Sequence, residues 1–126
     1  MDIIAEIGQA HDGSLGLAHS YIDAVAKTGC SAIKFQTHIA EAESSKYEPF
    51  RVKFSKQDAS RFDYWKRMEF SLDEWKDLKD HCDKVGIEFM SSPFSNAAVD
   101  LLEKVGVKRY KVGSGEVNNF VLLEKI

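Results

Sequence analysis

The sequence has no hydrophobic run approaching the ~20 residues that a membrane-spanning helix requires, and no basic leader precedes its first apolar stretch at Ile3. It has no basic excess either. Its 17 lysines and arginines against 20 acidic residues give a net charge of -3, which lacks the electrostatic footprint of a nucleic-acid-binding protein. The two cysteines, Cys30 and Cys82, show no C-x-x-C spacing, and no metal-ligand cluster is visible. We therefore expect a cytoplasmic protein with reduced thiols and no membrane or nucleic-acid partner.

The 126 residues, 44% hydrophobic and 29% charged, have the composition of an ordinary globular chain that can bury one modest core. Short segments with the two-residue period of strands alternate with segments that have helical spacing. The expected strands span residues 3–8, 31–37, 87–92 and 108–112. The expected helices begin after the capping residues Ser14, Ser71 and Ser95, and a last helix covers residues 120–126.

Three expected helices end in the same way and are each followed at once by a strand, at residues 27–29, 84–86 and 104–106. This self-similarity indicates repeated βα units and hence a parallel sheet, either open and doubly wound or closed as a (β/α)₈ barrel. A dinucleotide-binding sheet would require G-x-G-x-x-G after its first strand, and residues 8–13 do not supply it. We therefore expect an α/β fold of TIM-barrel type, with about the first four βα units. Such a half-barrel would be a fragment or would complete itself with a partner.

Residues 38–70 interrupt the alternation with a long segment rich in charges and aromatic side chains, in which a short helix is expected to start near Asp58. Connections of this length in compact domains are uncommon and often serve as lids or binding loops. A subunit contact or a small satellite cluster packed by the aromatic residues remains an equal alternative. We treat the segment as a long loop insertion in a single barrel-type domain, of which residues 1–126 form the N-terminal part.

Polar residues gather at the ends of the expected strands, and most have the parity opposite to the apolar residues that face the helices. They are Glu6, Lys34, Gln36, Ser92, Lys111 and Ser114. In a barrel these side chains would converge on one mouth, where active sites form. The stretch 111–116 adds glycines and Glu116 to a cation and a hydroxyl, a combination that suits a phosphate or carboxylate. The alternatives are a turn with a solvated lysine and, for Glu6 and Lys34, an ion pair that seals the barrel.

Five blocks in order carry a resemblance to a known family: residues 4–8, 11–14, 34–38, 91–95 and 110–116. Together they resemble the N-terminal half of N-acetylneuraminate (sialic acid) synthases and their nonulosonate-synthase relatives. The resemblance covers essentially the whole chain. One departure is Ala10, where the family usually has an asparagine before the histidine, so one loop contact of the family is in question.

The resemblance implies a TIM-barrel transferase of carbohydrate and polysaccharide biosynthesis. Such an enzyme condenses phosphoenolpyruvate with an open-chain N-acetylated amino sugar, such as N-acetylmannosamine, and releases phosphate. It implies a divalent metal, Mn²⁺ or Mg²⁺, held by residues outside this chain, and a homodimer in the full-length form, so the isolated chain is expected to be inactive. By resemblance, the positions that hold phosphoenolpyruvate are Lys34, Ser92, Lys111 and Ser114. Gln36 and Glu6 correspond to positions lining the sugar and reaction centre, and Glu116 to a candidate acid or base.

Two other functions fit the same residues. A lysine at a barrel strand end, Lys34 or Lys111, forms a Schiff base in aldolases when it is desolvated among other cations. A half-barrel that binds an anion without turnover is the non-enzymatic alternative. For the histidines, two at strand ends (His11, His38) and two in helices (His19, His81), hydrogen-bonded structural or surface roles are favoured over metal ligation.

Overall fold

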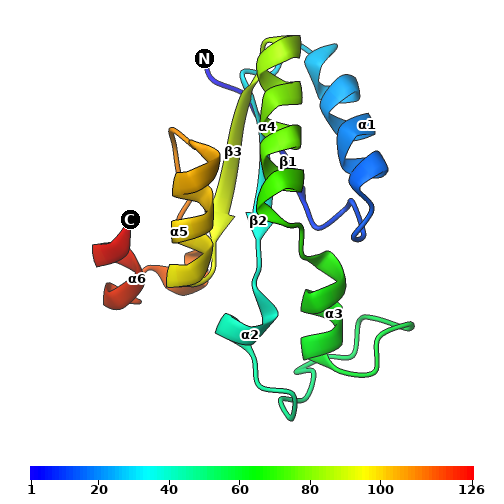
Figure 1. Cartoon of the computed structure of the whole chain (residues 1–126), viewed down its shortest axis with the longest axis vertical. Helices are drawn as coiled ribbons and strands as arrows, with labels where there is room; N and C mark the ends of the chain where they lie inside the picture. Colours follow the sequence, from blue (N-terminus) through cyan, green and yellow to red (C-terminus); the bar gives the residue numbers. More distant parts are fainter.

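The computed structural model describes residues 1–126 and is built on a three-stranded sheet in the order β1-β2-β3. The strands are β1 (Ile4–Gly8), β2 (Ala32–Thr37) and β3 (Glu88–Pro93). Both pairings are parallel, so the carboxyl ends of all three strands meet at one edge of the sheet (Figure 1). The expected parallel α/β fold is therefore confirmed.

Three helices, one after each strand, pack side by side, with α4 against both α1 and α5. They are α1 (Leu15–Ala26), α4 (Leu72–Val85) and α5 (Asn96–Val105). Each begins where the sequence predicts, because the hydroxyl of Ser14, Ser71 or Ser95 accepts a hydrogen bond from a backbone N–H of the first turn. In α4 the Glu74 carboxylate completes a capping box on Ser71.

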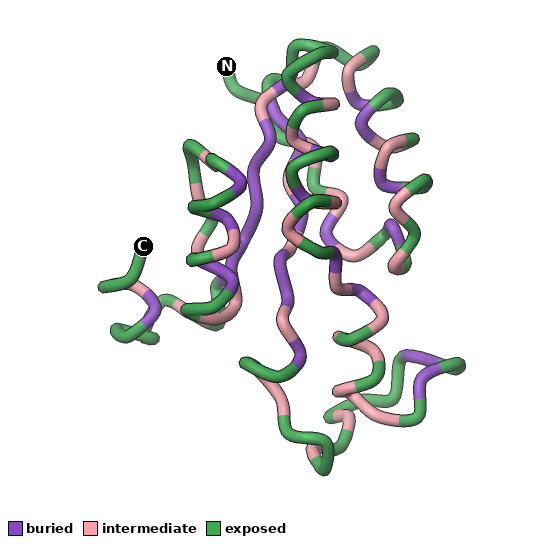
Figure 2. The backbone as a smooth tube through the Cα atoms, in the orientation of Figure 1, coloured by how far each residue is buried: buried purple, intermediate pink, exposed green.

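The core lies between the sheet and these helices (Figure 2). Phe35 of β2 and Phe89 of β3 stack with ring centroids 5.6 Å apart, and Trp75 of α4 meets Phe35 edge-on at 5.9 Å. All three are buried, and each large apolar side chain of this kind contributes roughly 1.5–3 kcal/mol through burial. The alternation predicted for β2 holds. Ile33, Phe35 and Thr37 are fully buried, whereas Lys34 and Gln36 face the other side and are half-buried.

The expected fourth strand over residues 108–112 is wrong as an extended element. Only Tyr110 forms a parallel bridge, with Ser91 of β3, and the Lys111 N–H donates to the Ser91 carbonyl at 3.2 Å. This edge segment has no neighbour on its far side, and its cations Lys108 and Arg109 are exposed, so a longer ladder would bury little apolar surface. The chain instead turns through a short 3₁₀ helix, η1 (Ser114–Glu116), into the expected last helix, α6 (Phe120–Lys125), which Asn119 caps.

Residues 38–70 contain two short helices, α2 (Ala40–Glu43) and α3 (Arg61–Met68). The expected helix near Asp58 is α3, which begins three residues later because Ser60 and Asp63 form a capping box. Both helices lie beyond the carboxyl ends of the strands, at the lower end of the molecule in Figure 1. None of the helices combines the length and the apolar character needed to span a membrane.

Candidate functional site

The polar face predicted from alternation forms rows across the sheet. The strand register places Glu6 beside Lys34, Lys34 beside Met90, and Gln36 beside Ser92. The Lys34 ammonium lies 2.8 Å from the Glu6 carboxylate, and the lysine side chain is only 14% exposed whereas that of Glu6 is 47% exposed. A cation this far from solvent needs a negative partner, and here the partner comes from the neighbouring strand.

Gly8, at the end of β1, lets the side chains of Glu6 and Gln36 approach the backbone. A Cβ at this position would lie 3.4 Å from both the Gln36 Nε2 and the Glu6 Oε1 atoms. The glycine also has φ +55°, a left-handed conformation that side-chain-bearing residues rarely adopt. The carboxyl end of β1 is therefore shaped around these two polar side chains.

Gln36 opens into a cavity of about 710 Å³ at the carboxyl ends of the strands. The cavity is lined from several elements, and its principal polar and aromatic residues are Gln36, His38, Glu43, Arg61, Trp65, Phe94 and Glu116. Its size and its mixture of aromatic walls with a few convergent polar groups are typical of small-molecule sites. Among its charged side chains, Arg61 forms an ion pair with Glu48, and the Glu116 carboxylate accepts a hydrogen bond from the neutral Asn119 amide at 2.7 Å.

The structure brings together some of the predicted site residues and leaves others apart. Glu6 and Lys34 form one ion pair, and Gln36 and Glu116 line one cavity. Ser92, beside Gln36 in register, is 2% exposed. Lys111 and Ser114 are exposed and lie in the segment that follows the Tyr110 bridge.

Sequence reasoning did not single out Glu43, and it assigned His38 a structural or surface role. In the structure the two side chains are joined, with His38 Nδ1 and Glu43 Oε2 2.7 Å apart, and both line the cavity. The signal that was available is a histidine directly after a strand with an acidic residue five positions later. Arg61 and Trp65 belong to the long segment that the sequence left between a binding loop and a packed cluster, and both also line the cavity.

The loop between β1 and α1 is clamped to the segment before and within α3. Arg67 of α3 donates to the Asp12 carboxylate at 2.7 Å and to the Asp58 carboxylate at 2.8 Å. The hydrogen bonds from Arg67 hold the pKa of Asp58 below its ordinary value. Within the same loop His11 is fully buried, and its Nδ1 accepts from the Gly13 N–H at 3.1 Å. Burial lowers the pKa of His11 to about 4, so this imidazole is neutral at physiological pH.

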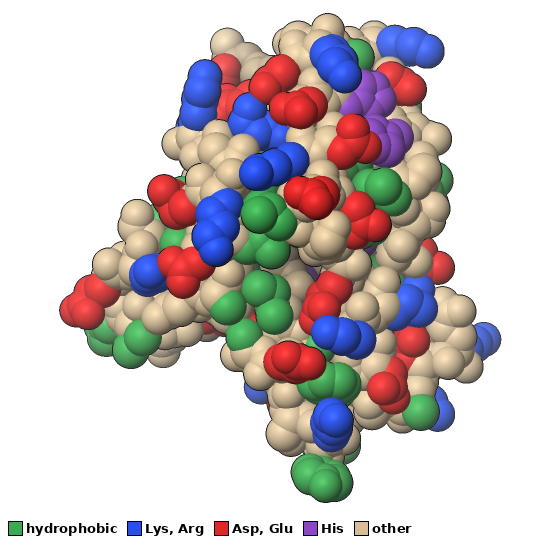
Figure 3. All heavy atoms as spheres, in the orientation of Figure 1, with side chains coloured by type: hydrophobic (Ala, Val, Ile, Leu, Met, Phe, Trp, Pro, Cys, Tyr) green, Lys and Arg blue, Asp and Glu red, His purple; other side chains and the backbone are tan.

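The other two histidines join α1 to α4, away from this cavity. His19 Nδ1 lies 2.7 Å from His81 Nδ1, and their outer nitrogens lie 2.9 Å from Asp77 and Asp23. In Figure 3 histidine side chains meet at the surface near the top of the molecule, where acidic and basic side chains are interspersed. Their bonds are consistent with the hydrogen-bonded role that the sequence suggests.

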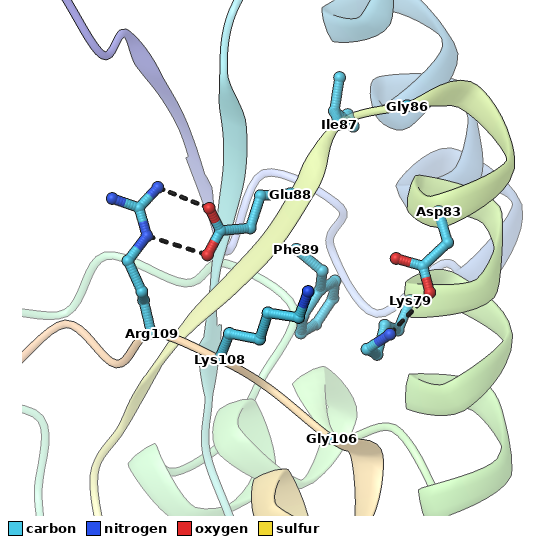
Figure 4. Close-up of a pocket in the computed structure, with 9 residues that line it drawn as sticks. All are labelled: Lys79, Asp83, Gly86, Ile87, Glu88, Phe89, Gly106, Lys108 and Arg109. Atoms are coloured by element: carbon cyan, nitrogen blue, oxygen red, sulfur yellow. Dashed lines mark hydrogen bonds and ion pairs between the residues drawn. The ribbon is translucent and has the colours of Figure 1, made fainter.

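A second cavity, of about 520 Å³, lies at the opposite end of β3 (Figure 4). Four of its five charged side chains are already paired with one another: Lys79 bonds to Asp83 at 2.6 Å, and Arg109 bonds to Glu88 at 2.6 Å, which leaves only Lys108 without a partner. Ligands of parallel α/β proteins bind at the carboxyl ends of the strands, and Glu88 begins its strand. The cavity beside Gln36 is therefore the better candidate site.

The residues of this chain do not form a metal centre. No three or more histidine, cysteine, aspartate or glutamate side chains are grouped so that they could hold an ion. Mn²⁺ and Mg²⁺ favour several oxygen ligands. Here the Glu6 carboxylate is already bonded to Lys34, and the Glu43 carboxylate to His38. The metal that the resemblance implies therefore does not fit the side chains present here.

The parallel sheet, with a polar row on one face and a cavity at its carboxyl edge, is that of an α/β protein, a class in which ligand sites form at the strand ends. The chain belongs to the NeuB family, whose model matches residues 21–126. It is 37% identical over 127 residues to an N,N'-diacetyllegionaminic acid synthase of Campylobacter jejuni, covering 98% of this chain and 38% of that protein. It is 36% identical to a human N-acetylneuraminate-9-phosphate synthase, covering 98% of this chain and 35% of that protein.

A solved structure agrees with the sequence relatives. The N-acetylneuraminic acid (sialic acid) synthetase of Leptospira borgpetersenii, in complex with citrate, matches with a TM-score of 0.77 and 31% identity. The match covers 98% of this chain and 39% of that chain. The chain thus spans little more than a third of the length of these relatives.

Proposed function

We propose that residues 1–126 form the N-terminal part of a (β/α)₈ barrel domain of a nonulosonate synthase. The strand order β1-β2-β3 is consecutive, and the Tyr110 bridge adds the next segment to β3. A doubly wound sheet reverses its order and carries helices on both faces, whereas here α1, α4 and α5 form one layer. That arrangement supports a barrel wall with an outer helical layer and an inner polar face. A homodimer and a cytoplasmic location are part of the same proposal.

The proposed reaction is the condensation of phosphoenolpyruvate with an open-chain N-acetylated amino sugar, with release of phosphate, to give a sialic-acid-type product. The observation that carries it is the inward row in which Lys34 is held by Glu6 and is followed by Gln36, in a chain of the NeuB family. The names of the relatives agree with a synthase of this kind.

In the proposed mechanism each side chain has a role that its position can supply. Lys34, with Lys111, Ser114 and Ser92, binds the anionic groups of phosphoenolpyruvate, since cationic donors form the stronger hydrogen bonds to phosphate and carboxylate. Gln36 holds the sugar with its reacting carbon against the enol carbon, and this positioning supplies much of the rate. Glu6 orients Lys34, and Glu116 acts as the acid or base for the water that adds as phosphate leaves. A divalent metal, when bound through residues beyond this chain, would polarise the sugar aldehyde.

A Schiff-base aldolase is the second enzymatic candidate, and the Lys34 contact weighs against it. A nucleophilic lysine is activated by desolvation or by neighbouring cations, whereas Lys34 is bound to a carboxylate at 2.8 Å. Borohydride reduction with pyruvate separates the two mechanisms. A mass increase on Lys34 or Lys111 would establish the aldolase, and an unmodified protein is expected.

The experiment for the proposed function is phosphate release from phosphoenolpyruvate by the longest natural form of this protein. N-acetylmannosamine, its 6-phosphate and diacetamido sugars are offered in turn, with Mn²⁺ and then with chelator. We expect release that requires one sugar and the metal. Binding of phosphoenolpyruvate in titration calorimetry without release with any sugar would instead establish a non-catalytic anion-binding module.

A further inference from the structure

His38 lies between two aromatic rings at the end of β2, where it touches the side chain of Gln36. We propose that His38, oriented by Glu43, is a positioning residue that sets which atoms of the Gln36 amide face the cavity. The inference rests on the proposed function only for the identity of the ligand. The contacts that carry it belong to this chain alone.

Glu43 holds one side of the imidazole. Its Oε2 lies 2.7 Å from His38 Nδ1, and its Oε1 accepts from the Ile39 N–H at 2.8 Å. The two side chains are only 4% and 8% exposed, so water does not compete for these bonds. A carboxylate is acceptor-only when ionised, and therefore Nδ1 carries the proton that joins them. The four-residue helix α2 serves to return Glu43 to the strand end that precedes it.

Two rings hold the plane of the imidazole. The Trp65 ring of α3 stacks on it with centroids 3.8 Å apart and planes at 16°, and Phe94, directly after β3, stacks on the other face at 4.2 Å and 11°. The three rings come from separate segments of the chain. Rotation of His38 would require both neighbours to move, so its second nitrogen has a defined direction.

That second nitrogen, Nε2, lies 3.3 Å from Gln36 Oε1. Because Nδ1 keeps its proton for Glu43, Nε2 donates to the Gln36 oxygen only in the doubly protonated ring, which leaves the Gln36 NH₂ group for a ligand. In the neutral ring Nε2 accepts from the NH₂ group, and the Gln36 oxygen faces the ligand. In both cases the contact fixes the Gln36 amide, so one defined polar atom of Gln36 is directed at a hydroxyl or acetamido group of an N-acetylated sugar.

The side chains of this cluster provide their own controls. In His38→Phe the aromatic ring remains between Trp65 and Phe94, and combining it with Glu43→Gln avoids leaving a buried carboxylate without a partner. In this double variant the ring at position 38 still stacks on Trp65 and Phe94, but the hydrogen bond to Gln36 is lost. The variant therefore separates packing by His38 from its contact with Gln36. His81→Phe, in α4 and outside the cavity, is the matched histidine control.

The kinetic test uses the longest natural form of the protein with phosphoenolpyruvate and the sugar that supports phosphate release. In the double variant we expect KM for the sugar to rise roughly 10-fold, with KM for phosphoenolpyruvate unchanged within about twofold. In a Gln36→Ala background the same double change should add no further loss, because the two positions act through one contact. Additive losses, or equal effects on both substrates, would overturn the positioning role.

A second measurement does not depend on turnover, so it separates this inference from the proposed function. In ¹⁵N spectra of the ligand-free protein, the Gln36 side-chain amide is assigned by comparison with Gln36→Ala. Its two protons should exchange slowly and shift when His38 is replaced, while His81→Phe leaves them in place. A Gln36 amide that is indifferent to His38 contradicts the proposal, even if the enzyme proves to be a synthase.

Discussion

Lys34 and Glu6 occupy one row of neighbouring parallel strands, and their charged atoms meet at 2.8 Å. The pair is asymmetric, since the lysine is largely buried while nearly half of the glutamate side chain remains exposed. Glu6 therefore keeps contact with solvent or ligand while it holds the lysine toward the strand ends. This arrangement makes the pair the part of the candidate site that is simplest to test.

Replacing Lys34 by methionine should abolish productive binding of phosphoenolpyruvate and leave the fold intact. Glu6, then unpaired, is exposed enough to be hydrated, so the free energy of unfolding should change by no more than about 1 kcal/mol. Turnover in the full-length protein should fall at least roughly 100-fold, because a charge-assisted contact to the anion is lost. Lys76→Met, an exposed position of α4, is the control and should keep full activity. Normal activity in Lys34→Met would refute the assignment.

Gly13→Ala should be strongly destabilising. A Cβ at this position would lie 2.2 Å from the Arg67 carbonyl oxygen, and the residue has φ +76°. The expected loss is roughly 2 kcal/mol or more, because a left-handed conformation and a backbone clash are combined. Gly16→Ala, in the first turn of α1 with nothing within 4 Å, should instead be neutral or stabilising by up to about 1 kcal/mol. Urea unfolding of the two variants checks both signs, and equal midpoints would contradict the structure.

Stability should fall as the pH drops from about 6.5 toward 4, partly because of His11. Burial lowers its pKa from 6.5 to about 4 in the folded state. In this window the unfolded chain binds a proton that the folded chain rejects, so the free energy of unfolding rises with pH. The contribution is complete above pH 6.5 and is lost toward the folded pKa.

The variant His11→Asn isolates this contribution. Its side-chain oxygen can still accept from the Gly13 N–H, as in an Asx turn, but it does not titrate. The free energy of unfolding, measured by urea titration, should therefore change less between pH 7 and pH 5 in the variant than in the wild type. The difference should be up to about 1.4 kcal/mol for each pH unit in the window. Equal pH slopes in the two proteins would show that His11 binds its proton equally well in the folded and unfolded states, so that its pKa is not lowered by folding.

The two cysteines should differ sharply in reactivity. Cys82 is fully buried, and burial raises the pKa of its thiol to about 12. Cys30 is half-buried and accepts a hydrogen bond from the Thr28 hydroxyl at 3.0 Å. A thiol-specific reagent at pH 8 should label only Cys30 in the folded protein, since the thiolate is the reactive form. Cys30→Ser should then show no labelling until denaturant is added, and rapid labelling of that variant would contradict the burial of Cys82.

Helix starts were predictable because capping is local. Ser14, Ser71 and Ser95 each bond to a backbone N–H three residues ahead, so the determinant and its consequence lie within one turn. The fourth strand was not predictable in the same way. Residues 108–112 have a strand-like composition, but a strand there depends on pairing with β3, which is distant in sequence. Only Tyr110 forms such a pair, with Ser91.

The sequence by itself determined the parallel α/β pattern and the polar face of the strands, because a two-residue period assigns side chains to opposite faces before any strand has paired. Tertiary structure decided which of those side chains meet. Arg67 bonds to Asp12, 55 residues away, and His38 is enclosed by Trp65 of α3 and by Phe94 after β3. Such contacts depend on how separate segments fold back over the strand ends. No local period encodes that geometry, so the cavity beside Gln36 and the role of Glu43 emerged only when the chain was folded.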